Sequence, residues 1–304
     1  MTMDTGRRAI ERACGQTGER LHLVFFGGEP LMRWRTLTRL TEVARHQAAA
    51  DGVELRPTVT TNGTLLSESR ARWLQQQGFV MAISCDGTRP AHDANRRTRS
   101  GRSCHTRTVA GMRRALEAGL AIRAIVVVDP SNVAELPASI DELRSIGVED
   151  FVINPNWSAD WSGDDERGAW AAAYGAVARR YAEGYRQDRP FWVSFIDGKI
   201  AAHIKGGYLP EERCDLGRRN WVVAPGGALY PCDRLVGEDR DSRFVIGNVV
   251  SGIDEALVAR FIQGVCKLPA ECLDCAVSSR CRNRCACANL AMTGDVQCPS
   301  EVLC

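Results

Sequence analysis

Cysteine is the residue type whose number and placement point most directly to chemistry in this sequence. The 304 residues contain 13 cysteines, and only Cys14, Cys85 and Cys104 lie in the first 213 positions. The others crowd the last 91 residues, beginning at Cys214. A reducing compartment disfavours disulfides, so in a cytosolic chain this crowding favours metal binding.

The spacing of these cysteines is specific. One run reads Cys272-x2-Cys275-x5-Cys281-x3-Cys285, and upstream Cys214 is followed by twelve residues, Gly227, four residues and Cys232. Short C-x-x-C spacings bring thiolates together through tight turns, as iron–sulfur clusters require. Structural zinc uses the same pairs, so zinc remains an alternative. The number of cysteines exceeds one tetrathiolate site and suits two centres.

Composition and charge exclude several other classes of function. The net charge is +2, with 44% hydrophobic and 25% charged residues, which is ordinary for a globular protein. This charge indicates neither nucleic acid nor an anionic membrane as a partner. No apolar run has the length of a membrane span, and the charged first twenty residues are unlike a signal peptide. The sequence therefore predicts a cytoplasmic protein.

The first half alternates helices and strands around glycines. We expect helices near residues 5–15, 30–49, 66–77, 105–118 and 132–146, and the last four each end just before a glycine, as helices often do. Expected strands cover 21–26, 53–60, 79–84, 121–128 and 151–154. The strand at 121–128 is so rich in β-branched residues that we expect it to be buried on both faces. The alternation predicts a parallel sheet that is closed or partly closed as a barrel.

Glycine-rich or polar segments follow four of these strands, at residues 27–30, 61–64, 84–87 and 154–157. The carboxyl ends of parallel strands form the ligand-binding edge of such sheets, so this edge is the predicted site. Helical segments near 166–187 and 192–205 then lead to a hairpin at 221–224 and 228–231. The shift in cysteine content places the domain boundary near residue 208, giving domains 1–207 and 208–304.

The motifs together resemble a known family. The cysteine pattern, with Gly247-Asn248-Val249 and Thr293-Gly294-Asp295, resembles the SPASM domain of radical S-adenosylmethionine (AdoMet, SAM) enzymes. Gly27-Gly28-Glu29-Pro30 resembles the GGEP segment of the same family. The segment from His92 to Arg96 also resembles the sequence found in that family. The resemblance implies an α/β fold: a parallel partial (β/α) barrel of the radical SAM type missing its first strand, followed by a small cysteine-rich α+β SPASM domain.

The resemblance also implies ligands for two cofactors. Residues facing AdoMet would be Gly27, Gly28, Glu29, Pro30, Thr61, Asn62, Gly63, Ser84, Asp86 and Arg96. One auxiliary 4Fe–4S cluster would use Cys214, Cys232 and Cys285, with an open iron or an unidentified fourth ligand; the other would use Cys272, Cys275, Cys281 and Cys304, in preference to Cys298. Cys266, Cys287 and Cys298 are expected to be buried thiols without a role.

Asp233, directly after Cys232, resembles the general base of anaerobic sulfatase-maturating enzymes, where it would accept a proton during substrate oxidation. A surface carboxylate paired with Arg234 or Arg240 is the alternative. Glu29 and Asp86 likewise have plainer alternatives, as a turn carboxylate and a turn cap.

The CxxxCxxC loop that binds the AdoMet-cleaving cluster of the family does not occur in this sequence. We therefore expect that this chain cannot itself generate the 5′-deoxyadenosyl radical. Either the sequence starts too late or the protein is a natural remnant, and the retained AdoMet-facing motifs favour an amino-terminal truncation.

The expected function is side-chain oxidation or crosslinking of a peptide or protein, as in the maturation of ribosomally made peptides. Formylglycine formation of the sulfatase-maturase type is an alternative that Asp233 favours. Non-catalytic alternatives are an iron–sulfur protein that recognises peptide or carries electrons, and a zinc-stabilised binding module. The resemblance implies a reductant such as flavodoxin or ferredoxin, and no nucleic acid or membrane partner.

Overall fold

The computed structural model describes residues 1–209, 212, 214, 216–236, 242–266, 270–281 and 285–303, with only the backbone described at 242, 263–266 and 303. These residues form two compact units. One contains residues 22–38 and 55–199, and the other contains 1–21, 39–54 and 200–304. The first unit carries the strand-end motifs and the second carries the cysteine-rich segment. The sequence-based boundary near residue 208 stays a prediction.

The first unit is built on a six-stranded sheet. Its strands are β1 (Arg20–Phe25), β2 (Glu54–Thr61), β3 (Val80–Ser84), β4 (Ala121–Val128), β5 (Asp150–Pro155) and β6 (Trp192–Val193). They lie in chain order from β1 to β6, and each neighbouring pair from β2 onward is parallel. The prediction of an α/β fold with a parallel, partly closed barrel is therefore confirmed.

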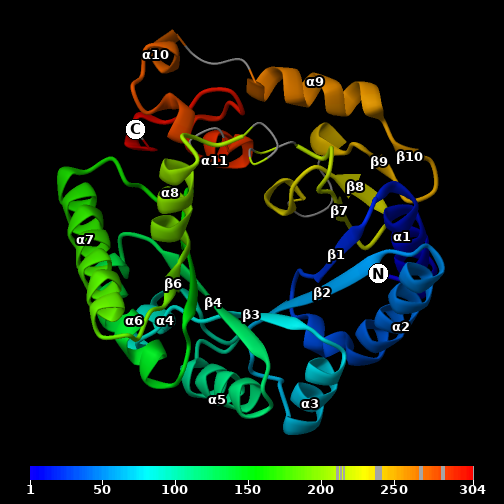
Figure 1. Ribbon diagram of the computed structural model, residues 1–304, viewed down its shortest axis with the longest axis horizontal. Coiled ribbons are helices and arrows are strands. Elements are labelled where there is room, and N and C mark those ends of the chain that lie inside the picture. The colour runs from blue at the N-terminus through cyan, green and yellow to red at the C-terminus, as the bar shows by residue number, and fades with distance from the viewer. Residues whose placement is uncertain are drawn as a thin grey trace. The chain divides into compact units, whose positions relative to one another are not determined.

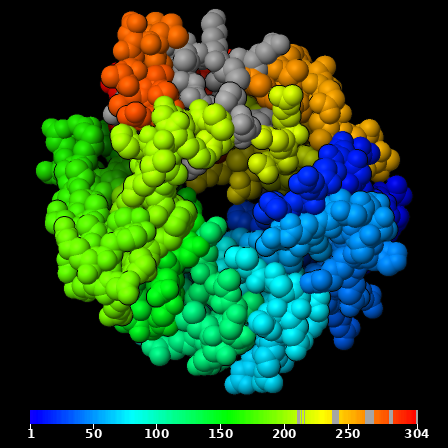
Figure 2. Space-filling view, viewed as in Figure 1, coloured from blue at the N-terminus to red at the C-terminus, as the bar shows by residue number. Residues whose placement is uncertain are grey.

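Helices lie between these strands and after the last one. They are α2 (Trp34–Ala50) after the 3-10 turn η1 (Pro30–Arg33), α3 (Glu68–Gln76), α4 (Arg89–Asn95), α5 (His105–Glu117), η2 (Val133–Glu135) with α6 (Leu136–Ser145), α7 (Asp164–Arg186) and α8 (Ser194–Ile204). Figure 1 shows α3, α5 and α7 on the outer side of the strands. In the space-filling view, α3 and α5 form the outer surface of this unit in cyan and green (Figure 2).

One expectation about the sheet was wrong. Strand β4 is not buried on both faces: every second residue from Ile122 to Val128 is buried, while Arg123, Ile125 and Val127 between them are only half-buried. The helices pack on one face of the sheet, so only that face forms a dry core. The other face of β4 stays available to polar side chains.

The second unit begins with α1 (Met3–Gln16), whose amino end is capped by Thr2. Its antiparallel sheet has the order β10 (Gly252–Ile253), β9 (Gly247–Asn248), β8 (Ala228–Tyr230) and β7 (Val222–Val223), which contains the predicted hairpin. Helix α1 packs on this sheet through Ala9, and Arg12 donates to the carbonyl oxygens of Val249 and Val250.

Short elements lie between β8 and β9 and after β10. They are the 3-10 turns η4 (Asp233–Leu235), η5 (Ser242–Phe244), η6 (Ser278–Arg280) and η7 (Glu301–Leu303), and the helices α9 (Glu255–Cys266), α10 (Ala270–Leu273) and α11 (Ala286–Thr293). Helix α11 ends at Gly294 in the left-handed conformation, a common helix terminator.

Candidate functional site

Glu29 joins the ends of β1 and β2. Its Oε1 accepts hydrogen bonds from the Leu31 amide at 3.0 Å and from Thr61 Oγ1 at 2.7 Å, and its Oε2 accepts from the Asn62 amide at 2.8 Å. A carboxylate offers about four acceptor positions. Three are filled by the protein, so Glu29 can accept one further donor, at Oε2. An ammonium group such as the one AdoMet carries would suit this position.

The two glycines before Glu29 are required by the backbone. Gly27 has φ of +91° and Gly28 has φ of +54°, a region that strongly favours glycine. A Cβ placed on either residue would meet no protein atom within 4 Å. The backbone beside Glu29 is thus open to a ligand, which fits the predicted AdoMet contact without testing it.

The segment after β2 is a fixed turn. Thr61 is buried, and its Oγ1 accepts from the Gly63 amide at 3.1 Å, while Asn62 Oδ1 accepts from the Thr64 amide at 2.9 Å. Thr108 of α5 donates to the Asn62 carbonyl oxygen at 2.9 Å. These bonds hold the Glu29 donors in place, so Thr61 and Asn62 position the carboxylate whether or not they also touch a ligand.

Asp86 and Arg96 form an ion pair after β3. Arg96 Nε lies 2.6 Å from Asp86 Oδ2 and its Nη2 lies 3.1 Å from Oδ1, and the Val127 amide donates to Oδ1 at 2.8 Å. Asp86 is 1% exposed and Arg96 is 26% exposed. Burial raises the pKa of Asp86, and Arg96 and the Val127 amide oppose that rise. The pair fixes the loop after β3 against β4, and it makes Asp86 more than a turn cap.

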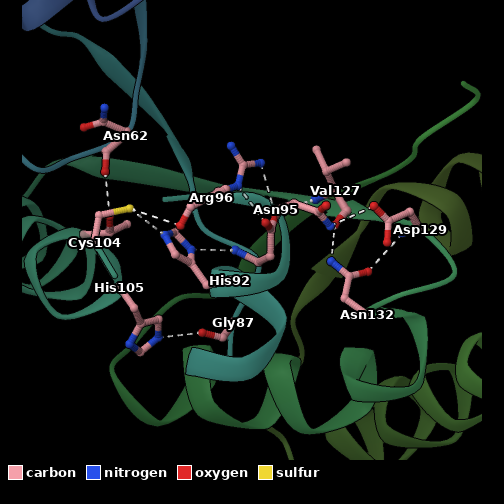
Figure 3. A network of polar contacts seen from close by, with 12 residues as sticks. Asn62, Gly87, His92, Asn95, Arg96, Cys104, His105, Val127, Asp129 and Asn132 are labelled. Carbon is pink, nitrogen blue, oxygen red and sulfur yellow. Dashed lines mark hydrogen bonds and ion pairs between the residues drawn. The ribbon is translucent and has the colours of Figure 1, made fainter. Parts of the chain in front are cut away.

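Two histidines, His92 and His105, contact the backbone of the loop that carries Asp86 (Figure 3). His92 Nδ1 accepts from the Asp86 amide at 3.4 Å, and its Nε2 lies 3.3 Å from Cys104 Sγ. Burial lowers the pKa of His92 to about 4, so the ring is neutral at pH 7. His105 Nε2 lies 2.7 Å from the Gly87 carbonyl oxygen. These contacts hold the loop around Asp86, and the sequence analysis did not single them out.

Other predicted residues have simpler surroundings. Ser84 is the last residue of β3 and lies opposite Ile125 of β4, half-buried. Pro30 is the first residue of η1, a favoured position for proline. Asp233 is exposed, and the Cys232 thiol donates to its Oδ1 at 3.3 Å. Arg240, its alternative partner, lies outside the described residues.

The thiols predicted for the first auxiliary cluster lie together in the second unit. The Ala286 amide, next to Cys285 in the chain, donates to the Cys214 sulfur, as does the Leu216 amide. The Arg234 amide donates to the Cys232 sulfur, and the Ala288 amide donates to the Cys285 sulfur. Backbone N–H groups directed at sulfur stabilise thiolates, and they tune the potential of iron–sulfur clusters. This donor set fits a thiolate-ligated centre.

Cys287 joins this group, although the sequence analysis gave it no role. Its Sγ lies 3.3 Å from Cys285 Sγ and 3.7 Å from Cys232 Sγ. The contacts with Cys287 lower the pKa of Cys285 to about 6 and also lower that of Cys232, while the pKa of Cys287 itself is raised. The pKa of Cys214 is raised because neighbouring atoms partly desolvate its sulfur, although the residue as a whole is exposed. The i, i+2 spacing of Cys285 and Cys287 was the available signal.

The second predicted set is less complete in the described part of the chain. Cys272 lies on α10, Cys275 is exposed in the following turn, and Cys281 follows η6. Cys304 and the side chain of Cys266 lie outside the described residues. Cys298 is exposed, so the expectation that it is a buried thiol was wrong. The second cluster therefore stays a prediction.

Neither a single-metal site nor a membrane-spanning helix is found among the described residues. Among them, no three His, Cys, Asp or Glu side chains are arranged to hold a single metal ion together. Of the helices in the same residues, none is both long and apolar enough to cross a membrane.

Comparisons with known proteins agree with this geometry. Residues 1–143 match the model of the Radical SAM superfamily. The chain is 25% identical over 276 residues to a serine-type anaerobic sulfatase-maturating enzyme of Klebsiella aerogenes, covering 87% of this chain and 66% of that protein. It is 24% identical over 305 residues to a cysteine-type anaerobic sulfatase-maturating enzyme of Clostridium perfringens, covering 91% and 76%. The chain thus spans about two thirds to three quarters of the length of these relatives.

Solved structures share the fold. Native anSMEcpe with bound AdoMet and the Kp18Cys peptide superposes with a TM-score of 0.81 at 18% identity, covering 94% of this chain and 82% of that one. SuiB of Streptococcus suis, bound to its precursor peptide SuiA, superposes with a TM-score of 0.66 at 14% identity, covering 100% and 69%. The resemblance inferred from the motifs is therefore confirmed at the level of the radical SAM domain and its fold.

Proposed function

Residues 1–143 match the model of the Radical SAM superfamily, and from this match we propose that the chain binds AdoMet and is part of an enzyme that modifies a side chain of a peptide or protein. The observation that carries the proposal is Glu29. Its carboxylate is fixed between the ends of β1 and β2, keeps one acceptor position at Oε2, and lies beside the open backbone of Gly27 and Gly28. Peptides are bound in the structurally similar proteins anSMEcpe and SuiB.

AdoMet, when reductively cleaved, supplies a radical that abstracts hydrogen from a substrate carbon. In the proposal, residues of this chain bind and position AdoMet. Glu29 binds the methionyl ammonium group, and the ion pair of Asp86 and Arg96 holds the adjacent strand end in place. The cysteine-rich segment would hold auxiliary 4Fe–4S clusters, which would supply an acceptor for the electron left on the substrate. A reductant of the flavodoxin or ferredoxin type would supply electrons.

AdoMet binding tests the proposal directly. Glu29→Gln keeps the shape of the side chain but removes its charge, and it presents an NH2 group where the carboxylate accepted hydrogen bonds. A charged hydrogen bond contributes about 2 kcal/mol, so we expect AdoMet to bind about 30-fold more weakly. Isothermal titration calorimetry with AdoMet measures the change. Glu54→Gln, which removes the exposed partner of Arg20, is the matched control; equal affinity in both variants would contradict the proposal.

The 304 residues contain no CxxxCxxC segment, so the proposal includes a negative expectation. With dithionite and AdoMet under anaerobic conditions, residues 1–304 alone should release no 5′-deoxyadenosine above a protein-free control. Liquid chromatography measures the product. Catalytic release of 5′-deoxyadenosine would show that another group of this chain supports AdoMet cleavage, and would overturn this part of the proposal.

One observation favours a more specific candidate, the oxidation of a serine or cysteine side chain as named for the sulfatase-maturating relatives. Asp233 is exposed and lies in contact with Cys232, where a carboxylate could take the proton released as the substrate carbon is oxidised. In a longer form of the enzyme that includes a CxxxCxxC segment, Asp233→Asn should then abolish turnover while peptide affinity and iron content stay unchanged. A loss of iron instead would make Asp233 a support for Cys232 only.

Structural zinc is the rival interpretation of these thiols, although among the described residues no three His, Cys, Asp or Glu side chains are arranged to hold a single metal ion. Zinc–sulfur bonds of about 2.3 Å in a tetrahedron separate the sulfurs by about 3.8 Å, and Cys232 and Cys287 are 3.7 Å apart. Counts of iron, sulfide and zinc in anaerobically purified protein separate the two. Zinc without sulfide would overturn the auxiliary clusters.

A further inference from the structure

The predicted first auxiliary cluster is one thiol short of a full set. Cys214, Cys232 and Cys285 supply three, whereas each iron of a fully thiolate-ligated 4Fe–4S cluster takes its own cysteine. The structure brings a fourth sulfur to the same place. Cys287 lies 3.3 Å from Cys285 Sγ and 3.7 Å from Cys232 Sγ, in a segment whose cysteine spacing gave it no role.

The local fold explains why Cys287 reaches this group. Cys285 is the residue that precedes α11 and has an extended backbone, and Cys287 is the second residue of the helix. Helical side chains tilt toward the amino end of their helix, so Cys287 points back along the chain toward Cys285. The same amino end supplies the Ala286 amide to Cys214 and the Ala288 amide to Cys285. One helix start therefore organises three of the four thiols.

The surroundings of Cys287 also suit a cluster. The residue is 7% exposed and packs in an apolar group with Leu216, Leu235 and Ala286, against which Phe244 also packs. These side chains exclude water from one side of the thiols. Low solvent access protects a cluster from hydrolysis and oxygen, and it tunes the potential at which the cluster accepts an electron.

We propose that Cys287 is the fourth ligand of the auxiliary cluster held by Cys214, Cys232 and Cys285. The inference rests on the proposed function, since it requires that this segment binds an iron–sulfur cluster. On ligation the Cys287 thiol releases one proton and forms one iron–sulfur bond, which replaces its present contacts with the Cys232 and Cys285 sulfurs. With four cysteines the cluster has no iron open to substrate, and its role is limited to electron transfer.

Differential alkylation of the anaerobic, iron-loaded chain tests this assignment. Iodoacetamide labelling, read by peptide mass spectrometry, is measured before and after the iron is removed with a chelator. We expect Cys287 to label at least ten times faster after iron removal, together with Cys214, Cys232 and Cys285. Cys14 is the matched control because it is also helical and buried, 2% exposed, and lies in the same unit; its labelling rate should not change.

Variants give a second readout. Cys287→Ala should lose iron, or keep a cluster whose electron paramagnetic resonance spectrum changes on addition of cyanide, because an iron without a thiolate binds small anions. Cys214→Ala should behave alike, and Cys14→Ala should match the unmodified chain.

The outcomes separate this inference from the proposed function. Unchanged iron, an unchanged spectrum with cyanide and an unchanged labelling rate of Cys287 would overturn the assignment while leaving the cluster intact. A disulfide between Cys285 and Cys287 in the iron-loaded chain would also overturn it. Absence of iron and sulfide from the unmodified chain would instead overturn the cluster itself, and with it the electron-transfer part of the proposed function.

Discussion

Removal of Arg96 should destabilise the first unit, residues 22–38 and 55–199, in a pH-dependent way. Arg96→Met keeps an apolar stem of similar length but leaves Asp86, 1% exposed, with the Val127 amide as its remaining donor among the contacts described above. Breaking a buried ion pair by removing one partner costs about 3 to 5 kcal/mol, because a buried charge is left uncompensated. We expect a loss of this size at pH 8.

The sign of the pH dependence follows from the Asp86 carboxyl. Burial raises its pKa, Arg96 opposes the rise, and removal of Arg96 raises the pKa further. A raised carboxyl pKa stabilises the folded state only at a pH below the pKa, where the group is protonated, and this stability is lost as the pH rises. The deficit of Arg96→Met should therefore shrink between pH 8 and pH 5.

Urea unfolding followed by tryptophan fluorescence measures this deficit, because all the tryptophans except Trp221 lie in the first unit. Arg123→Met is the matched control. Arg123 also binds an aspartate, Asp150, with two nitrogens, but both side chains are more exposed, at 43% and 31%. An exposed pair contributes about 1 kcal/mol or less. Equal losses in the two variants, or a loss in Arg96→Met that does not change with pH, would refute the reasoning.

Three further predictions concern residues around the site. Gly111→Ala should destabilise the chain by about 1 to 3 kcal/mol in urea unfolding, because its Cβ would lie 2.2 Å from the Gly63 carbonyl oxygen; Gly168→Ala on α7, which meets nothing, should stabilise it by about 0.5 to 1 kcal/mol. His92, whose pKa burial lowers to about 4, should show the nitrogen shifts of a neutral ring down to pH 5 in NMR titration, and a titration near pH 6.5 would contradict its burial. Cys85, fully buried with its pKa raised to about 12, should resist iodoacetamide at pH 8 until the chain is unfolded.

The regular elements of the fold could be predicted from the sequence because local patterns determine them. Glycine marks the end of α3 at Gly78 and of α5 at Gly119, and both have the left-handed backbone that such ends require. Strand β3 and strand β4 follow immediately as apolar runs. The degree of burial of β4 could not be predicted, because it depends on which face the helices cover and not on the strand itself.

The side-chain contacts of the site were harder to predict. The order of the motifs showed that Glu29, Thr61 and Asp86 lie at strand ends. It did not show that Glu29 uses three acceptor positions for hydrogen bonds within the protein. Cys287 was missed for a related reason. Its distance from Cys232 is a property of how α11 packs on η4, and 55 residues separate the two in the chain.

The two interpretations of Glu29, as a turn carboxylate and as a cofactor ligand, are compatible. A carboxylate free to rotate would lose side-chain entropy when it bound an ammonium group, whereas Glu29 is already held by Leu31, Thr61 and Asn62. Its three protein donors leave one acceptor position on Oε2 for a ligand. The structural hydrogen bonds are therefore what would make the binding of a cation at this position favourable, and a variant that preserved the turn but not the charge would separate the two roles.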